Sequence, residues 1–566
     1  MRNPRSGPGG GPDGAARGKW WPLVAITLGN FMLLVDVTIV NTALPQMAHG
    51  LNTSFSSLQW VMDIYALALA ALLMVAGSAA DLFGRRRLYV LGLIVFAVSS
   101  LACGLAPDGT VLIVARAVQG AGAAAMFATN TPLLMATYSG RDRGVAFGVW
   151  GGTGGAATAV GPLLGGLLTE YADWRWIFWV NLPLTAVAVW ATLRSVKESR
   201  LEPTGPRGTR PGIDWPGAIS FTVCAGGLTY GLMRGGEHGW SDSGTLAALL
   251  VALAALIVFL AVERRARQPL LELKLFRRPS FAVLMAAALL LQAAAFPYLT
   301  YAGLWLQTVL GLSPMQAGLA VMPMAAVSLV VGAVGGRLLH RVAPQLPLGI
   351  GMVFIGAGAL THSLLLSADS GWAALAPGLA LGGLGVGMSM PVLVSAALGA
   401  APPERGGMAS GAVNTFRQMG YALGIAILGM VFASRVRGMV SGSDALPADA
   451  GGRAAEAISG GHSGEIVASA PTGAARQGVE SLVHESFVAG LDRICLISGI
   501  VAVAAGLVVL AVVRRNEPEA ASGPKAEAGP DGGDGGGGGG DGDGDGNGNG
   551  NGNGTVGRPE SERVGA

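Results

Sequence analysis

One carboxylate, Asp36, lies inside an apolar run that begins near Trp21 and stays uncharged for the length of a membrane span. An acid held in the hydrocarbon layer costs about 2.5–3.5 kcal/mol on insertion scales. A chain that keeps such a group usually uses it, for example to carry a proton or to bind a ligand. The competing interpretation is an acid that only pairs with a basic neighbour and locks two helices together.

Arg116, in a separate apolar block, is a candidate for that basic neighbour. Asp36 lies eight residues before Leu44, which places it about 12 Å from one membrane face. Arg116 lies five residues after Val111, about 8 Å from the face that we expect to be the same one. Opposite charges at similar depth are tolerated when they pair or line a watery cavity. The spacing predicts the shared depth and leaves contact between the two open.

A second acid, Asp81, ends an apolar block just before Gly84 and three consecutive arginines that begin at Arg85. Gly84 can adopt the positive φ that a tight turn needs. Asp81 lies near the negative pole of its helix, so a cation or the N-terminus of a facing helix should satisfy it. An ion pair that forms in one conformation and breaks in another would make this turn a gate latch. The alternative is a simple topology anchor.

Small residues dominate the apolar stretch from 144 to 169. Glycines four apart, such as Gly148 and Gly152, let helix backbones approach closely. Gly161, Pro162 and Gly165 follow, and a proline inside a helix removes a backbone hydrogen bond and bends it. The pattern predicts a helix that slides or rocks against a neighbour during a conformational change, with plain tight packing as the alternative.

The composition is that of a membrane protein. Only 13% of the 566 residues are charged and 51% are hydrophobic, whereas soluble domains carry about 25% charged residues. The apolar residues fall in blocks long enough to cross a bilayer as helices. We expect fourteen spans, near 21–44, 59–80, 88–105, 111–133, 144–169, 176–194, 217–233, 245–262, 281–309, 315–339, 347–367, 373–399, 408–433 and 490–513.

Basic residues follow every even-numbered span. The loops after those spans carry most of the arginines and lysines, whereas the short odd-numbered loops offer only Arg175 and Arg234. Cytoplasmic loops carry this excess of positive charge, so both termini are predicted to be cytoplasmic. The loop at 434–489 is too long for the charge rule and is expected to be extracellular and mostly irregular. The abundance of Ala, Gly and Arg suggests a bacterial gene, and hence the bacterial cytoplasmic membrane.

Several classes of function are disfavoured. The net charge of +3 is too small to argue for nucleic acid. The three cysteines lie in apolar blocks, which predicts free thiols and no metal site. The Asp541-Gly-Asp543-Gly-Asp545 tail has Gly552 where a calcium loop needs Glu. No P-loop or His-Glu-x-x-His motif is present, so we expect neither an enzyme nor a cofactor.

Taken together, these stretches resemble the major facilitator superfamily, specifically its fourteen-helix drug:proton antiporter branch. The resemblance covers about 21–513. The matching stretches, in chain order, are Asp36 to Pro45, Gly77 to Arg87, Arg116 with Gln119, Gly120 and Gly122, Gly161 to Gly166, Trp174 to Pro183, and Asp214 to Gly217. One departure is the second-half copy of the loop motif, Gly335 to Arg341, which lacks the acid. A latch in that half must therefore work differently.

The resemblance implies an all-α membrane protein with two six-helix bundles and two extra central helices. We therefore expect a disordered cytoplasmic N-terminus at 1–20, an N-terminal bundle at 21–194 and two extra helices within 195–280. A C-terminal bundle should occupy 281–513, with the extracellular loop 434–489 inside it. The last part, 514–566, is expected to be a disordered cytoplasmic tail rich in Gly, Asp and Asn.

The resemblance also implies roles for individual residues. Asp36 and Arg116 would couple proton movement, with Asp36 as the main carrier because later spans hold no deep acid. Asp81, Gly84, Arg85, Gly161, Pro162 and Gly165 would take part in gating. Substrate should bind near the midplane between the bundles. The candidate contacts are Asn30, Gln292, Phe296, Tyr298, Tyr301, Trp305, Gln307, Met388, Met390 and Arg417. For Arg417, structural pairing and anion binding are equally good interpretations.

The implied function is proton-coupled export of amphipathic, cationic or antibiotic-like small molecules by alternating access. A proton from outside would neutralise Asp36, and the deprotonated acid would pair with Arg116 or attract a cationic substrate. The expected partners are a drug or natural product, protons and the lipid bilayer, and the expected state is a monomer. The alternatives are a narrow exporter of one endogenous metabolite or self-made antibiotic and, from a different class, a non-transport membrane sensor or enzyme.

Overall fold

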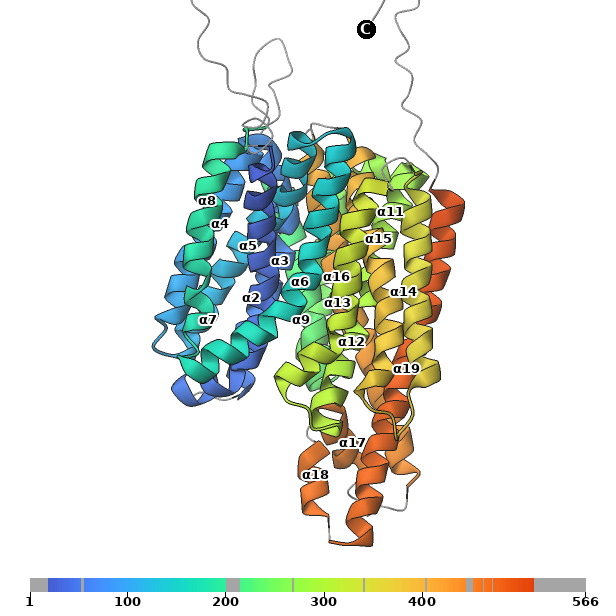
Figure 1. The fold of residues 1–566 in the computed structure, drawn as a ribbon. Coiled ribbons are helices and arrows are strands. Elements are labelled where there is room, and N and C mark those ends of the chain that lie inside the picture. The colour runs from blue at the N-terminus through green and yellow to red at the C-terminus, as the bar shows by residue number, and fades with distance from the viewer. Residues whose placement is uncertain are drawn as a thin grey trace, which may run out of the picture. The chain divides into compact units, whose positions relative to one another are not determined.

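The computed structural model of the protein describes residues 19–51, 55–199, 214–266, 269–338, 342–402, 405–443, 451–461, 463–470 and 472–513. Every regular element in these ranges is helical (Figure 1). The expected N-terminal segment 1–20 and the tail 514–566 lie almost wholly outside the described residues. The elements that position the candidate site are two groups of long helices and one helix pair between them in sequence.

The first group contains the helices up to residue 195. They are α2 (Trp21–Leu51), α3 (Phe55–Phe83), α4 (Arg85–Gly104), α5 (Gly109–Thr137), α6 (Gly140–Tyr171), α7 (Trp176–Trp179) and α8 (Asn181–Ser195). Local chemistry sets their ends. Gly84 separates α3 from α4 with φ +108°, a value that favours glycine. The Asp108 carboxylate accepts a hydrogen bond from the Val111 amide at 2.9 Å and so caps α5.

The helix pair α9 (Trp215–His238) and α10 (Ser243–Glu263) follows. Asp214 caps α9 by accepting from the Gly217 amide, and Asp242 caps α10 by accepting from the Thr245 amide, each at 3.0 Å. Helix α9 packs on α3 and α16, whereas α10 packs mainly on α9. Large apolar side chains on α10, such as Leu250 and Ile257, are therefore more than 60% exposed. Lipid covers such a surface in a membrane protein.

The second group begins at residue 279. It contains α11 (Pro279–Ala295), α12 (Pro297–Leu304), the π-helical turn η2 (Trp305–Val309), α13 (Pro314–Leu338), α14 (Gln345–Leu365), α15 (Ala376–Gly399), α16 (Gly406–Ser441) and α19 (Ala474–Val512). The expected single span 281–309 is divided at Phe296, because Pro297 has no amide hydrogen to continue the ladder. The two groups pack together through α6 on α13 and through α3 and α5 on α16.

Twelve helices of the described residues are long and apolar enough to cross a membrane. These twelve do not include α6 and α9, which have 32 and 24 residues. The sequence-based count of fourteen requires both of these helices to cross as well, so that count stays a prediction.

The expectation of a mostly irregular stretch at 434–489 is wrong. Helix α16 continues to Ser441, α19 begins at Ala474, and two short helices, α17 (Gly451–Ser459) and α18 (Ser463–Ser469), lie between them. Figure 1 shows α17 and α18 next to the first turns of α19, at the lower end of the view. Helix α17 forms because it has an apolar face: Ala454, Ala455 and Ile458 are buried.

Candidate functional site

The Asp36 carboxylate is fully buried and is held by three donors, two from α5 and one from the first residue of α8. Arg116 Nη1 donates to Asp36 Oδ2 at 2.6 Å. Gln119 Nε2 and Asn181 Nδ2 both donate to Asp36 Oδ1, at 3.0 Å and 3.1 Å. The two charged residues that the sequence placed at similar depth are therefore in contact.

The guanidinium of Arg116 is as closely engaged as the acid. Its Nε donates to the Val61 carbonyl at 3.0 Å and its Nη1 to Gln119 Oε1 at 2.7 Å. The Tyr65 ring lies 4.2 Å from the guanidinium carbon, a cation–π distance. Arg116 is only 1% exposed, so the pair is closed off from bulk water in this structure.

Apolar side chains surround the pair. Val35 and Ile39 on α2, Leu112 on α5 and Phe178 on α7 belong to one buried cluster. In such surroundings a lone ionised carboxylate is very unfavourable, whereas a protonated acid or a paired acid is tolerated. The site can therefore hold a proton on Asp36 or a salt bridge to Arg116. The change between these states alters which buried charges the surrounding helices must compensate.

Asp81 joins the two helix groups at one end of the membrane domain, here called the Asp81 end. Its carboxylate pairs with Arg85 Nη2 at 2.8 Å. It also accepts from the amides of Gly407 at 2.8 Å and Met408 at 2.9 Å, which lie in the first turn of α16. The first-turn amides and the positive end of the helix dipole stabilise an anion there. The sequence predicted a cation or a facing helix N-terminus beside Asp81, and both are present, as Arg85 and the start of α16.

Two glycines make this contact close. A methyl group added at Gly77 would overlap the Gly407 carbonyl, and one added at Gly407 would overlap the Gly77 carbonyl. Helices α3 and α16 therefore touch backbone to backbone beside Asp81. Larger side chains at either position would separate the two groups at this end, and the hydrogen bonds from α16 to Asp81 would be lost.

The glycine-rich part of α6 lies against α2. A methyl group at Gly161 would overlap the Thr38 hydroxyl, and that hydroxyl lies 3.5 Å from the Ala157 carbonyl. Helix α6 runs unbroken from Gly140 to Tyr171, through Pro162 and Gly165. The gating role of Gly161, Pro162 and Gly165 stays a prediction.

A comparison with known families decides the classification. The sequence profile of the Major Facilitator Superfamily matches residues 26–425. The chain belongs to the Major Facilitator Superfamily. The multidrug resistance protein Stp of Mycobacterium tuberculosis is 37% identical over 73% of this chain and 75% of its own length. The tetracenomycin C resistance and export protein of Streptomyces glaucescens is 33% identical over 90% of this chain and 94% of its own length.

Another relative is the puromycin resistance protein of Streptomyces alboniger, 37% identical over 74% of this chain and 82% of its own. Among solved structures, the human organic anion transporter MFSD10 aligns with a TM-score of 0.57 and 13% identity. The alignment covers 87% of this chain and 99% of MFSD10. The proton:xylose symporter XylE aligns with a TM-score of 0.55 and 13% identity, over 88% of this chain and 96% of XylE. The expected major facilitator fold is confirmed.

The predicted substrate contacts of this major facilitator protein lie in both helix groups. Asn30 is buried in the first helix group, where it donates to Thr153 at 2.8 Å. Tyr298 and Trp305 are buried in the second group, the former beside the His362 ring at 5.6 Å. Gln307 is exposed and its amide bonds its own helix. The role of these four residues in substrate binding stays a prediction.

The remaining candidates lie on α11, α12, α15 and α16. Phe296, Tyr301 and Met388 are partly exposed, whereas Met390 is buried. Tyr301 stacks near Phe432, with ring centroids 4.9 Å apart. Gln292 and Arg417 are in contact, with Arg417 Nε donating to Gln292 Oε1 at 3.4 Å.

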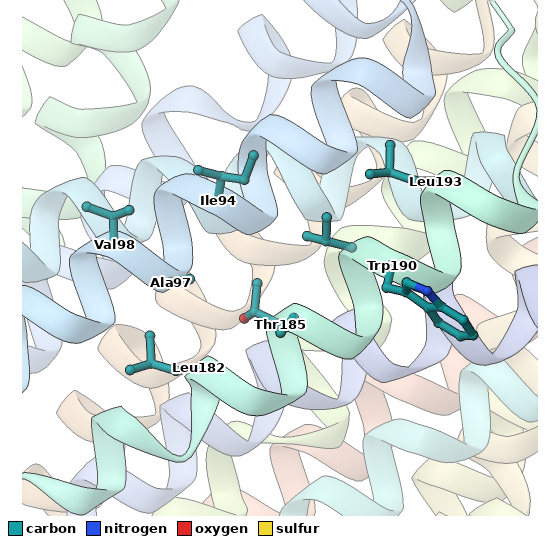
Figure 2. Close-up of a pocket in the computed structure, with 9 residues that line it drawn as sticks. Ile94, Ala97, Val98, Leu182, Thr185, Trp190 and Leu193 are labelled. Atoms are coloured by element: carbon teal, nitrogen blue, oxygen red, sulfur yellow. The ribbon is translucent and has the colours of Figure 1, made fainter.

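An apolar groove between α4 and α8 contains none of these candidates. Figure 2 shows Ile94 and Val98 on one helix facing Thr185 and Trp190 on the other. Its lining is almost entirely aliphatic and aromatic. It therefore belongs to the surface between two neighbouring helices and not to the candidate proton or substrate sites.

Sequence reasoning assigned no role to Asn181 or Glu263. Asn181 belongs to the matching stretch Trp174 to Pro183, and its place among apolar residues was the available signal that it satisfies a buried acid. Glu263 ends α10 and accepts from the Leu270 and Leu271 amides, at 3.0 Å and 3.2 Å. The Leu270 carbonyl in turn accepts from Ser78 on α3 at 3.2 Å. The segment after α10 is thus tied to the Asp81 end.

Proposed function

We propose that this chain exports amphipathic, drug-like small molecules across the bacterial cytoplasmic membrane in exchange for protons, by alternating access. The observation that carries this proposal is the buried Asp36–Arg116 pair within the membrane-spanning helices, at 2.6 Å. The names of the relatives, which refer to multidrug resistance and to antibiotic resistance and export, support a small-molecule substrate.

The proton step follows from the cost of burying charge. A proton that arrives from outside binds a carboxylate oxygen of Asp36 and makes the acid neutral. Arg116 then loses its counter-charge, while Gln119 and the Val61 carbonyl continue to hold it. Release of the same proton to the cytoplasm restores the salt bridge. Each state favours a different packing of helices around the pair, which links proton occupancy to the direction of opening.

The Asp81 contact supplies the gate. With both termini in the cytoplasm, the Asp81 end is the cytoplasmic end, and the α3–α16 contact closes it. Opening toward the cytoplasm requires the Gly407 and Met408 amides to leave the Asp81 carboxylate. Arg85 stays within reach of Asp81 because both belong to the first helix group, and it would satisfy the acid in the open state.

The chain is proposed to work as a monomer, with no cofactor and no catalytic activity of its own. The proton gradient is the source of energy. A narrow exporter of one self-made antibiotic is the second candidate, and the name of the tetracenomycin C resistance and export protein favours it. The two candidates differ in breadth of substrate and not in mechanism.

Purified full-length protein in proteoliposomes tests the proposal. Protein molecules whose cytoplasmic face points outward should exchange lumenal protons for external dye. When the lumen is acidic, permanently charged and neutral dyes should therefore accumulate inside the proteoliposomes. An ionophore that exchanges protons for potassium should abolish accumulation, and protein-free liposomes should show none. Accumulation that ignores the pH gradient would contradict antiport. No accumulation across a broad dye panel, together with resistance of a pump-deficient host to one compound, would favour the narrow exporter.

A further inference from the structure

Arg417 is the one deep arginine of α16 that has no acidic partner in the described part of the chain. It lies eleven residues after Gly406, about 16 Å along the helix from the Asp81 end. Its Nη1 donates to Asn414 Oδ1 at 3.0 Å and its Nε to Gln292 Oε1 at 3.4 Å. Both partners are neutral amides, and no described residue accepts from Nη2.

Other charged groups at depth are compensated. Asp36 pairs with Arg116 at 2.6 Å, and Asp81 pairs with Arg85 at 2.8 Å and with the start of α16. The remaining acids on spans next to α16 are distant along the membrane normal. Asp63 and Asp492 each lie about 30 Å from the end of their helix at the Asp81 face, nearly twice as far as Arg417. The unbalanced charge at the level of Arg417 is therefore positive.

The face of α16 that carries Arg417 lies at the boundary between the two helix groups, since Gln292 on α11 belongs to the second group. Residues seven apart lie on the same side of a helix, and Ser410 lies seven residues before Arg417. The Ser410 hydroxyl lies 2.7 Å from the Thr131 hydroxyl on α5, across the boundary between the groups. Arg417 as a whole is partly exposed, and it lies beside that boundary.

The chemistry of the guanidinium defines what it would bind. Its planar fork matches a carboxylate or another oxyanion with two parallel hydrogen bonds. Gln292 and Asn414 fix two of its nitrogens and leave Nη2 for a further acceptor. A guanidinium away from bulk water without an anion is unfavourable, so an anionic ligand group gains more here than a neutral one.

We propose that Arg417, held by Gln292 and Asn414, binds the ionised acid group of the exported molecule. The preferred substrates are then amphipathic molecules that carry a carboxylate or an ionised phenol. This inference rests on the proposed export function and replaces the expected preference for cations. The Asp36 carboxylate, which was expected to pair with Arg116 or to attract a cation, accepts from Arg116, Gln119 and Asn181 in this structure.

Binding of a matched pair of probes tests this inference. Pyrenebutyric acid and its methyl ester differ in the acid group alone, and their fluorescence anisotropy reports binding to full-length protein in nanodiscs, with empty nanodiscs as the blank. At neutral pH the wild-type protein should bind the acid about tenfold more tightly than the ester, the effect of one charge-assisted hydrogen bond. The preference should fade as the pH falls below the pKa of the probe.

Three variants locate the effect. Arg417→Gln should bind acid and ester equally, and Arg417→Lys should keep part of the preference because it keeps a point charge without the fork. Arg435→Gln is the matched control, since Arg435 lies on the same helix but is exposed on another part of it. It should behave as the wild type. A preference that survives in Arg417→Gln would overturn the assignment.

Two further outcomes are decisive. If Arg417→Gln does not fold, as judged by size-exclusion chromatography, the wild-type comparison across pH decides, and equal affinity for acid and ester at every pH contradicts the inference. If dyes are exported in response to a pH gradient but the acid is not preferred, this inference fails while the proposed function stands. If no dye responds to the gradient, the proposed function itself fails.

Discussion

Asp36 Oδ2 lies 2.6 Å from Arg116 Nη1, and both side chains are at most 1% exposed within the first helix group. The candidate anion site at Arg417 lies on α16, in the second group. Proton and substrate would therefore bind to different halves of the molecule. Their coupling must pass through the contacts between the halves, and the Asp81 contact with α16 is the most polar of those described.

Removing Arg116 should destabilise the protein strongly. Arg116→Ala leaves Asp36 buried without its counter-charge, a change that costs about 3–5 kcal/mol in comparable pairs. The melting temperature in detergent should therefore fall. Adding Asp36→Asn to Arg116→Ala should recover part of the loss. Losses that simply add in the double variant would contradict the coupling of the two residues.

Breaking the Asp81 contact should open the Asp81 end. Asp81→Asn removes the charge that the Gly407 and Met408 amides stabilise, and charge-assisted hydrogen bonds contribute about 1.5–3 kcal/mol. Loss of about 2 kcal/mol shifts a two-state equilibrium about thirtyfold. Spin labels on cysteines introduced at Arg141 and Leu346, one in each half, should lie farther apart in this variant than in the wild type. Double electron–electron resonance measures the distance between the labels.

The matched control for that experiment is Glu198→Gln. Glu198 accepts from the Arg86 and Arg87 amides at the start of α4, so it joins elements of one half only. The label distances should not change in this variant. Because the three native cysteines are buried, labelling should be confined to the introduced ones. An unchanged distance distribution in Asp81→Asn would remove the basis for the latch.

A methyl group at Gly77 should have the same direction of effect without a change of charge. It would overlap the Gly407 carbonyl and force α3 and α16 apart. Overpacking of this kind costs about 1–3 kcal/mol. The same spin-label pair should therefore report opening in Gly77→Ala. Gly166→Ala is the control, because nothing lies within 4 Å of the added methyl group. Equal behaviour of the two variants would show that the close contact does not hold the gate.

Cysteine labelling tests the number of membrane spans. If α9 and α10 both cross, Ser241→Cys in the loop between them should react with an impermeant maleimide added to whole cells. Arg265→Cys, after α10, should react only once the membrane is permeabilised. Both side chains are exposed in the structure. Labelling of the two positions from the same side would contradict the fourteen-span topology.

Much of the candidate site could be inferred from residue types alone. An acid and an arginine at similar depth in apolar surroundings have few ways to be satisfied, so Asp36 and Arg116 pointed to each other. Asp81, at the negative end of its helix, required a cation or a helix N-terminus for the same reason. Burial of charge is so unfavourable that the sequence itself limits the possible partners.

The sequence did not predict which distant segments would meet. The contact of Asp81 with α16 joins residues more than 300 positions apart, and nothing in local periodicity encodes it. The substrate candidates stay predictions, because polarity and aromaticity on a long helix do not define which side faces a neighbour. The helices α17 and α18 were missed because short Ala- and Gly-rich stretches give a weak helical signal.

The central claim is that Asp36 carries the coupled proton. Its most direct test is substrate-induced proton flux in proteoliposomes that contain a lumenal pH indicator, with Asp36→Asn compared against wild type and against Asp173→Asn, an acid in an exposed turn. Asparagine keeps the size of the side chain and an acceptor for Arg116, so the variant should fold. Wild type and Asp173→Asn should release protons when substrate is added, and Asp36→Asn should release none. Proton flux of wild-type size in folded Asp36→Asn would contradict the account.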